Sequence, residues 1–309
     1  MRVIFMWTPD FAVPSLEALL TKHEVVLVVT QPDKPKGRGK KMVPTPVKAC
    51  ALEHGIPVLQ PEKVKEPEFV EQLRSYEPDL IAVTAFGQIL SEPILEMPKY
   101  GCINVHGSLL PKYRGAAPMQ WSIIDGEKVT GITTMYMAKG LDSGDMLLKA
   151  EVEITDEDTF ATIHDKMAVT GANLLLDTLD QLEAGTLERI PQDHDAATYA
   201  PMITKETGHI DWSKNRQDII NLIRGLNPVP AAYTIYEEEV LKIFGAVISD
   251  VQADGAANGE IVAVVKKGFV VKCGDGCLLI TEVQARGGKR MMTDAYLRGH
   301  AMKEGILLQ

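Results

Sequence analysis

The alternation of short apolar runs with helical stretches is the feature that most constrains the fold of this chain. Five apolar runs lie in its first half: Val3–Met6, Val25–Thr30, Leu80–Phe86, Cys102–Val105 and Ile132–Met137. Between them lie stretches of helical character, at Pro14–Leu20, Pro46–His54 and Pro118–Ile124. Strands that alternate with helices form βαβ units, in which helices cover both faces of a mostly parallel sheet. We therefore predict an α/β domain with a mostly parallel sheet.

The second half of the chain changes character. Asp145–Ile154 is predicted as a further strand toward a sheet edge, and Asp158–Glu183 as a long amphipathic helix. The pattern dissolves into polar residues after Gly185, which indicates a linker on the surface. One helix (Gln217–Ile223) and a small β-barrel are expected beyond it. The five short strands of that barrel are predicted at Ala232–Tyr236, Val240–Phe244, Gly259–Val265, Phe269–Cys273 and Cys277–Gln284.

Composition excludes several classes of protein. Of 309 residues, 45% are hydrophobic and 24% charged, which is typical of a globular chain rather than a disordered or fibrous one. No apolar run reaches the roughly 20 residues that span a bilayer, so we expect no membrane association. Four cysteines in a chain of this length do not form a disulfide scaffold. We expect a reduced, cytoplasmic protein.

A basic segment stands out against an acidic background. The net charge is −10, yet residues 31–48 contain six basic residues and one acidic residue. A local positive patch on an acidic body predicts that a polyanion meets one face only, although a solvated loop is the ordinary explanation of such a cluster.

Two common kinds of site are unsupported. The first predicted strand–helix turn, at residues 6–11, lacks G-x-G-x-x-G, and no G-x-x-x-x-G-K-[ST] motif occurs. Cys273 and Cys277 have no second cysteine pair, so we interpret them as flanking a hairpin turn and expect no metal site.

Polar residues near one predicted strand indicate chemistry. Asn104 and His106 are two apart in a strand and so project to the same face. An amide and an imidazole side by side can bind a developing oxyanion. Asp142, in the glycine-containing loop after Ile132–Met137, is placed to meet the residues of the neighbouring strand. A carboxylate beside a histidine indicates proton transfer, although either residue alone is more often structural.

These residues lie in motifs that resemble those of a known family. Residues 101–118 (GCINVHGSLLPKYRGAAP) resemble the signature of folate-dependent formyltransferases, and residues 140–147 (GLDSGDML) resemble their second motif. Thr8–Phe11, the segment 31–48, residues 210–212 (IDW) and residues 224–228 (RGLNP) narrow the resemblance to the methionyl-tRNA formyltransferases. The resemblance covers nearly the whole chain.

The resemblance implies a Rossmann-like catalytic domain followed by an OB-like barrel. We expect a catalytic domain at 1–189, a linker at 190–205 and a tRNA-binding domain at 206–309. It also implies transfer of a formyl group from 10-formyltetrahydrofolate to the α-amino group of methionine on initiator tRNA. No metal is expected, and we expect a monomer.

The family's roles fall on residues of this sequence. Catalysis is implied for Asn104, His106 and Asp142. Folate binding is implied for Ser108, Leu109, Leu110 and Pro111, with Phe86, Gly87, Gln88, Ile89 and Leu90 walling the pterin pocket unless they only pack. The tRNA contacts are implied for Arg38 as the central residue, with Lys36, Lys40 and Lys41. Basic residues near the barrel strands are further candidates for phosphate contacts, or else solvated lysines and arginines: Lys266, Lys267, Lys272, Arg286, Lys289 and Arg290.

Two positions depart from the family pattern. Trp7 stands where the family has glycine, and its indole is expected to narrow the cleft for tRNA or methionine. Val229 stands where tryptophan is usual, which removes a packing indole.

Three other functions remain open. A formyltransferase acting on a ribonucleotide or an amino-sugar nucleotide would use the same trio but would require neither the basic segment nor a second domain. A formyltetrahydrofolate hydrolase would admit water to the same site. A catalytically silent RNA-binding protein is disfavoured by the intact trio.

Overall fold

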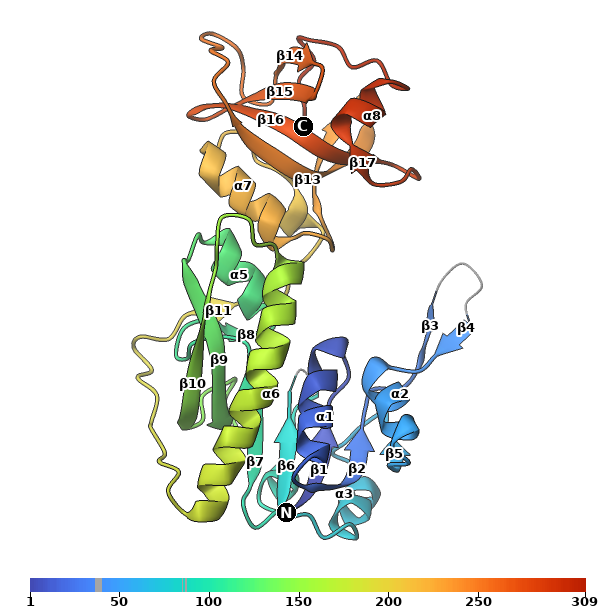
Figure 1. Ribbon diagram of the computed structural model, residues 1–309, viewed down its shortest axis with the longest axis vertical. Coiled ribbons are helices and arrows are strands. Elements are labelled where there is room, and N and C mark those ends of the chain that lie inside the picture. Colours follow the sequence, from blue (N-terminus) through green and yellow to red (C-terminus); the bar gives the residue numbers. More distant parts are fainter. Residues whose placement is uncertain (37–40, 85, 87) are drawn as a thin grey trace. The chain divides into compact units, whose positions relative to one another are not determined.

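The computed structural model describes residues 1–36, 41–84, 86 and 88–309 (Figure 1). It divides into two compact units. The first contains Met1–Pro118, Val129–Glu153 and His164–Ala200, and the second contains Met119–Lys128, Ile154–Ile163 and Pro201–Gln309. In the described part of the chain, no helix combines the length and apolarity needed to cross a membrane.

The first unit is built on a seven-stranded sheet in the order β10-β9-β7-β6-β1-β2-β5. Its strands are β1 (Arg2–Met6), β2 (Glu24–Val29), β5 (Val58–Leu59), β6 (Leu80–Val83), β7 (Cys102–His106), β9 (Val129–Tyr136) and β10 (Met146–Glu153). The five strands from β7 to β5 are parallel, whereas β9 runs antiparallel to both β7 and β10. The predicted mostly parallel sheet and its edge strand are confirmed.

Helices cover both faces of this sheet. On one face, Leu73 of α3 and Ile94 of α4 pack in one apolar cluster with Ile4 and Ile81. On the other face lie α1 and α6 (Figure 1), and Thr178 of α6 hydrogen-bonds Thr134 of β9 at 2.8 Å. The helices of this unit are η1 (Asp10–Ala12), α1 (Val13–Leu20), α2 (Pro46–Glu53), α3 (Pro67–Arg74), α4 (Glu92–Leu95) and most of α6 (Phe160–Ala184). The predicted α/β layering is therefore present.

Two small ribbons supplement the main sheet. Strands β3 (Lys34–Lys36) and β4 (Lys41–Val43) pair antiparallel, and this pair, called the basic hairpin below, extends away from the main sheet (Figure 1). Strand β8 (Arg114–Gly115) pairs in parallel with β11 (Tyr199–Ala200). The second ribbon matters for the site below, because it ties residues 199–200 to the loop that follows β7.

The second unit centres on an antiparallel sheet in the order β12-β13-β16-β15-β14, with β17 also paired to β16. Its elements are α5 (Pro118–Ile124, the first residue excepted), η2 (Glu206–Gly208), α7 (Arg216–Gly225), β12 (Ala232–Tyr236), β13 (Glu239–Ser249), β14 (Ile261–Val265), β15 (Gly268–Cys273), β16 (Gly276–Ala285), β17 (Met291–Met292) and α8 (Thr293–Leu297). The five strands expected from the sequence are all present.

The last residues of the chain close this sheet. The backbone N–H and C=O of Gln309 both bond to Ile235 of β12. A few residues earlier, Gly305 and Ile306 bond to Ile261 of β14. The terminal segment therefore bridges the two edge strands, which gives the predicted barrel its closure.

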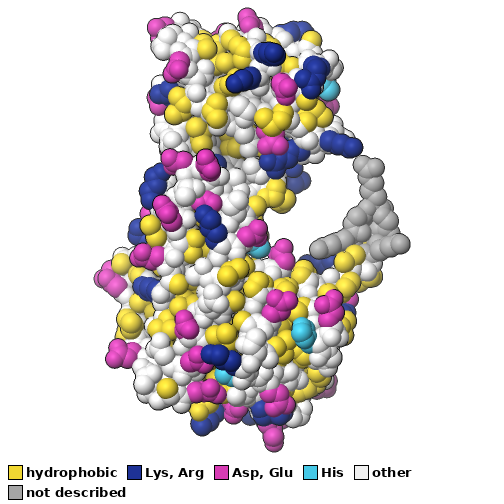
Figure 2. All heavy atoms as spheres, viewed as in Figure 1, with side chains coloured by type: hydrophobic (Ala, Val, Ile, Leu, Met, Phe, Trp, Pro, Cys, Tyr) yellow, Lys and Arg dark blue, Asp and Glu magenta, His cyan; other side chains and the backbone are white. Residues whose placement is uncertain are grey.

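Charged side chains of both signs are interspersed over the face shown in Figure 2. The net charge of −10 is thus not gathered there into one acidic field.

Candidate active site

The candidate site begins on β7, near the middle of the main sheet. Strand alternation places Cys102, Asn104 and His106 on one face, where the Cys102 thiol reaches the carbonyl of Ile94 in α4. Val105 points to the opposite face, toward α6. Asn104 and His106 are buried, with 8% and 6% of their surface exposed. A polar pair kept from bulk water in this way is suited to holding a charge that develops during a reaction.

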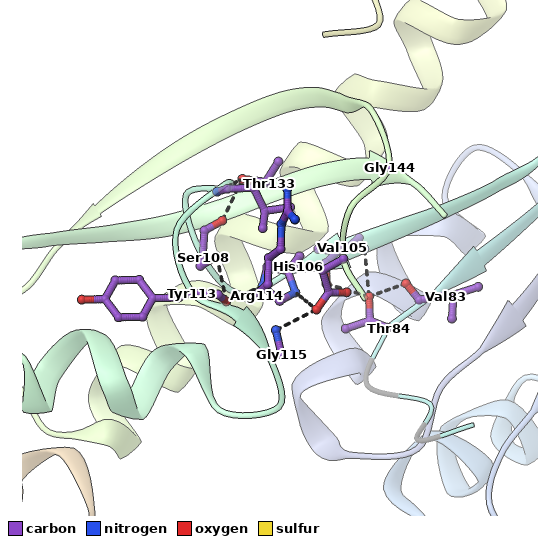
Figure 3. Close-up of polar contacts among 12 residues, drawn as sticks. Val83, Thr84, Val105, His106, Ser108, Tyr113, Arg114, Gly115, Thr133 and Gly144 are labelled. Atoms are coloured by element: carbon purple, nitrogen blue, oxygen red, sulfur yellow. Dashed lines mark hydrogen bonds and ion pairs between the residues drawn. The ribbon is translucent and has the colours of Figure 1, made fainter. Parts of the chain in front are cut away.

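The imidazole of His106 is held by two contacts (Figure 3). Its Nε2 atom lies 2.9 Å from the carbonyl oxygen of Tyr113, and its Nδ1 atom lies 3.7 Å from Oδ2 of Asp142. A carbonyl oxygen only accepts hydrogen bonds, so Nε2 carries the proton. The other nitrogen is left to gain or lose a proton beside a carboxylate. The structure thus brings together the histidine and the carboxylate that the sequence analysis paired.

Asp142 is held in an uncommon conformation. Its φ is +44°, in the left-handed region that only a few per cent of residues other than glycine adopt, aspartate among them. The backbone N–H of Gly115 donates a 2.8 Å hydrogen bond to Asp142 Oδ2. Gly115, at φ +116°, approaches β11 so closely that a Cβ would lie 2.8 Å from the Ala200 oxygen. The carboxylate is therefore fixed by a backbone donor on a tightly packed ribbon.

The loop that carries Asp142 reaches His106 by an unexpected route. The sequence analysis placed this loop beside its neighbouring strand, as if both strands ended at one edge. Since β9 is antiparallel to β7, Tyr136 at the end of β9 pairs with Ile103 near the start of β7. Residues 137–145 must therefore return along the sheet to bring Asp142 to His106.

The stretch expected to bind folate, residues 108–111, is firmly held. Ser108 donates to the Lys112 carbonyl at 2.6 Å, and Thr133 bonds both the Ser108 oxygen and the Leu110 nitrogen. The Ser108 and Leu110 side chains are buried, whereas Leu109 and Pro111 are half-buried. The stretch thus offers a fixed backbone and two accessible apolar side chains.

The second folate candidate, residues 86–90, divides into packing and exposed parts. Phe86 and Leu90 belong to the apolar cluster under the sheet, and Gln88 accepts a hydrogen bond from the Val64 nitrogen. Ile89 is 88% exposed. Gly87 lies outside the described residues. The plain packing interpretation thus fits Phe86 and Leu90, and Ile89 is the side chain open to a ligand.

The basic hairpin is anchored at its base. Lys48 Nζ donates to Asp33 Oδ2 and to Gln60 Oε1, each at 2.6 Å. Gln60 also bonds Asp33 Oδ1 and the backbone oxygen of Gln31. The hydrogen bond from Lys48 lowers the pKa of Asp33. The positive charge of the half-buried Lys48 is therefore balanced by the Asp33 carboxylate.

Of the four expected tRNA contacts, the structure describes the backbone of two. Lys36 and Lys41 pair with each other through their backbones in β3 and β4. Arg38 and Lys40 lie outside the described residues.

Trp7 corrects one expectation. The indole lines no cleft, because Trp7 is fully buried. It stacks on Phe5 with 5.0 Å between ring centroids and lies 6.2 Å from Phe11. Trp7 is thus a packing residue within its own unit. Val229, the other departure, is 67% exposed.

The six basic residues predicted as phosphate contacts near the barrel strands fall into two groups. Arg290 forms two 2.7 Å bonds to Glu282, Arg286 pairs with Glu239 at 3.2 Å, and Lys272 donates to a backbone carbonyl. Lys266, Lys267 and Lys289 are exposed, with no ion pair to any described residue. The three lysines of the second group are therefore the ones whose charge is available to a ligand.

Cys273 and Cys277 flank the turn between β15 and β16, as predicted, and both thiols are buried. Among the residues that the structure describes, no three His, Cys, Asp or Glu side chains are grouped to hold a metal ion.

Gln192 is the residue that sequence reasoning missed. It lies in the segment predicted as a surface linker, yet it is buried and contacts the loop of Asp142. Its partner Arg114 stands inside the quoted motif without an assigned role. Nothing in the polar pattern around residue 192 distinguishes it from its exposed neighbours, so only the structure could reveal it.

Comparison with known proteins defines the class to which this fold and this site belong. A model of the formyl transferase domain matches residues 1–179, and a model of the formyl transferase C-terminal domain matches residues 202–301. The chain belongs to the formyl transferase family. Within that family it is 53% identical over 309 residues to methionyl-tRNA formyltransferase of Acetivibrio thermocellus, covering 100% of this chain and 99% of the relative. It is 55% identical over 307 residues to the enzyme of that name from Ruminiclostridium cellulolyticum, covering 99% and 98%. The resemblance inferred from the motifs is confirmed.

Solved structures share the fold at low identity. WlaRD, a sugar 3N-formyl transferase, matches with a TM-score of 0.67 at 18% identity, over 92% of this chain and 97% of its own. HypX from Aquifex aeolicus matches with a TM-score of 0.65 at 17% identity, where all of this chain spans 50% of HypX. These matches support the Rossmann-like fold of the first unit.

Proposed function

We propose that this protein transfers the formyl group of 10-formyltetrahydrofolate to the α-amino group of methionine on initiator tRNA, in support of translation initiation. The observation that carries the proposal is the pairing of His106 with Asp142 beside Asn104. The choice of tRNA as the acceptor is supported by the identity above 50%, over the whole chain, to relatives named methionyl-tRNA formyltransferase. The sugar N-formyltransferase WlaRD shares 18% identity with this chain, which makes a small amine the weaker candidate.

The chemistry requires three tasks of the protein. The free amine attacks the formyl carbon, a tetrahedral oxyanion forms, and the carbon–nitrogen bond to folate then breaks. Asn104 donates to the oxyanion from its amide, and protonated His106 donates from Nδ1, since Nε2 is already engaged by Tyr113. Removing one such donor typically costs about 3 kcal/mol of transition-state stabilisation.

Asp142 serves the proton movements. The attacking amine must lose a proton, and the folate nitrogen that leaves must gain one. Asp142 relays the proton from the attacking amine to the leaving folate nitrogen, directly or through water, and keeps the His106 ring oriented. The Gly115 N–H keeps the carboxylate oriented while it does so.

The co-substrate and the acceptor are assigned to separate surfaces. We assign folate to the backbone of residues 108–111 and to the apolar side chains Leu109, Pro111 and Ile89, because a flat pterin needs an open apolar surface. The tRNA acceptor end is assigned to the basic hairpin, with Arg38 as the central contact and Lys36, Lys40 and Lys41 beside it. Lys266, Lys267 and Lys289 of the second unit are exposed and suited to further phosphates.

The remaining assignments follow from this proposal. Residues 1–189 carry catalysis, residues 190–205 connect, and residues 206–309 bind tRNA. The catalytic trio comes from a single chain, so a monomer suffices, and we place its work with protein synthesis in the cytoplasm.

The test compares acceptors at a fixed concentration of 10-formyltetrahydrofolate. We expect formylation of methionyl initiator tRNA at a far higher kcat/KM than of methionine methyl ester or a dTDP-amino sugar. Arg38→Ala is expected to raise KM for the tRNA and to leave the rate with the ester unchanged. If Arg38→Ala lowers kcat/KM equally with tRNA and with the ester, the assignment of the hairpin to tRNA binding is wrong. If the protein prefers the amino sugar, the proposed function is wrong.

A further inference from the structure

Gln192 binds the loop of Asp142 through its side-chain amide. Its Nε2 donates to the carbonyl oxygens of Asp142 and Gly144, at 2.8 and 2.7 Å. Its Oε1 accepts from Nε and Nη2 of Arg114, at 3.0 and 2.6 Å. Gln192 is 6% exposed and Arg114 is 3% exposed. Four hydrogen bonds within a buried space fix this side chain.

The direction of the amide is set by its partners. A guanidinium only donates hydrogen bonds and a carbonyl only accepts them. The oxygen of Gln192 must therefore face Arg114, and its NH₂ group must face the two carbonyls. A carboxylate at this position would satisfy Arg114 and would repel the Asp142 loop, because it offers no donor.

Asp142 is thereby held from two sides. Gly115 donates to its carboxylate and Gln192 donates to its backbone carbonyl. Gly115 bonds Asp142 directly, and the neighbouring Arg114 holds Gln192, so both supports depend on strand β8. At a φ of +44° the backbone of Asp142 is unfavourable and requires such external support.

The segment that carries Gln192 also binds the loop after β7. Thr198 accepts from the Tyr113 nitrogen through its hydroxyl at 2.9 Å and from the Arg114 nitrogen through its carbonyl at 2.8 Å. Tyr113 is the residue whose carbonyl holds His106. Residues 190–200 therefore join the loop whose Tyr113 carbonyl holds His106 to the loop that carries Asp142.

We propose that Gln192 is a positioning residue, which sets the distance between Asp142 and His106 by holding the Asp142 loop against Arg114. This proposal rests on the proposed formyl transfer, since it acts through Asp142. A displacement of about 1 Å in a reacting group lowers a rate by about 100-fold. The loss belongs to kcat, because Gln192 is assigned no contact with folate or tRNA.

Two variants and one control test this role. Gln192→Glu keeps an acceptor for the buried guanidinium and removes both donors, so it folds even if Gln192→Met does not. Both are expected to lower kcat by about 100-fold with KM for methionyl-tRNA within about twofold. Asp193→Asn is the control, because within the described part of the chain the exposed Asp193 side chain accepts from the Asp195 nitrogen and contacts neither loop of the site. Its kcat should match wild type, with circular dichroism reporting the folded fraction of each protein.

A double-mutant cycle separates positioning from general support of the fold. Single-turnover rates are measured for wild type, Gln192→Glu, Asp142→Asn and the double variant. If Gln192 acts through Asp142, Gln192→Glu causes little further loss in the Asp142→Asn background. An equal loss in both backgrounds, or near-wild-type kcat in Gln192→Glu, overturns the proposal. Absence of formyl transfer by wild type would instead reject the proposed function.

Discussion

The Nδ1 atom of His106 lies 3.7 Å from Oδ2 of Asp142, while Nε2 of the same ring donates to the carbonyl of Tyr113. The ring has thus one fixed nitrogen and one that faces a carboxylate. Nδ1 is therefore the nitrogen through which the ring can act together with Asp142. This arrangement predicts that removing either side chain lowers kcat to a similar extent.

His106→Ala and Asp142→Asn are each expected to lower kcat by about 10²–10⁴-fold, as for loss of a positioned acid–base group. Binding of methionyl-tRNA should change little, since neither His106 on β7 nor Asp142 in the loop after β9 belongs to the hairpin. Asp145→Asn is the matched control from the same loop, because the Asp145 carboxylate pairs with Arg189 at 2.8 Å. Near-wild-type turnover in either site variant would contradict the mechanism.

Lys48→Met should loosen the base of the basic hairpin. Hydrogen bonds to charged groups contribute roughly 1.5–3 kcal/mol, so the free energy of unfolding is expected to fall by that order. KM for tRNA should rise while folate binding is retained. Lys22→Met is the control: its ion pair with Asp180 is also 2.6 Å long, but both side chains are nearly half exposed, and such pairs contribute at most about 1 kcal/mol.

The ion pair between Lys48 and Asp33 makes the stability of the protein depend on pH. Its hydrogen bonds lower the folded-state pKa of Asp33 below the ordinary 3.8. The contribution is therefore fully present above that value and is lost as the pH falls through the lowered pKa. Lys48→Met should reduce stability at pH 7 and lose this difference at strongly acidic pH. A constant difference in free energy of unfolding down to the acid limit would contradict the assignment.

Trp7→Gly tests whether the indole packs or restricts a substrate. Truncation of a fully buried tryptophan costs about 3–5 kcal/mol, so we expect a large drop in melting temperature with kcat/KM unchanged at temperatures where the variant is folded. Trp7→Phe should lose much less, because the buried indole N–H has no hydrogen-bond partner among the described residues. A gain in tRNA use by Trp7→Gly would restore the cleft role.

His23 gives a second pH dependence, in stability. Burial lowers its pKa from 6.5, aided by the Met1 amine and Lys22 and opposed by Glu183 and Asp180. The unfolded chain therefore binds a proton that the folded protein does not. The contribution of neutral His23 to the free energy of unfolding is fully present above pH 6.5 and is lost as the pH falls through the lowered pKa. His23→Leu should flatten this fall between pH 7 and 5, whereas substitution of the exposed His54 should not.

The sequence predicted most of the scaffold, because periodicity marks single elements well. Strand direction was harder. The alternation that revealed β9 contains no signal that it runs antiparallel to β7, so the return path of the Asp142 loop was missed. The closure of the barrel by Gly305–Gln309 was likewise invisible, since it depends on backbone bonds that any side chains permit.

The candidate site was partly predictable for a similar reason. Asn104 and His106 share a strand, and two-residue spacing identifies their common face. Gln192 is 50 residues from Asp142 and lies among polar residues, so no local pattern marks it. Trp7 was misjudged because a motif gives a position in the sequence and not the burial of its side chain.

The most direct test of formyl transfer to tRNA follows both products in one reaction. Purified protein is mixed with methionyl initiator tRNA and 10-formyltetrahydrofolate, and formyl-methionyl-tRNA is measured against tetrahydrofolate released. The account predicts equal amounts of the two, with no folate turnover when the tRNA is omitted. Release of tetrahydrofolate without formylated tRNA would contradict it and would identify the protein as a hydrolase or as a transferase for another amine.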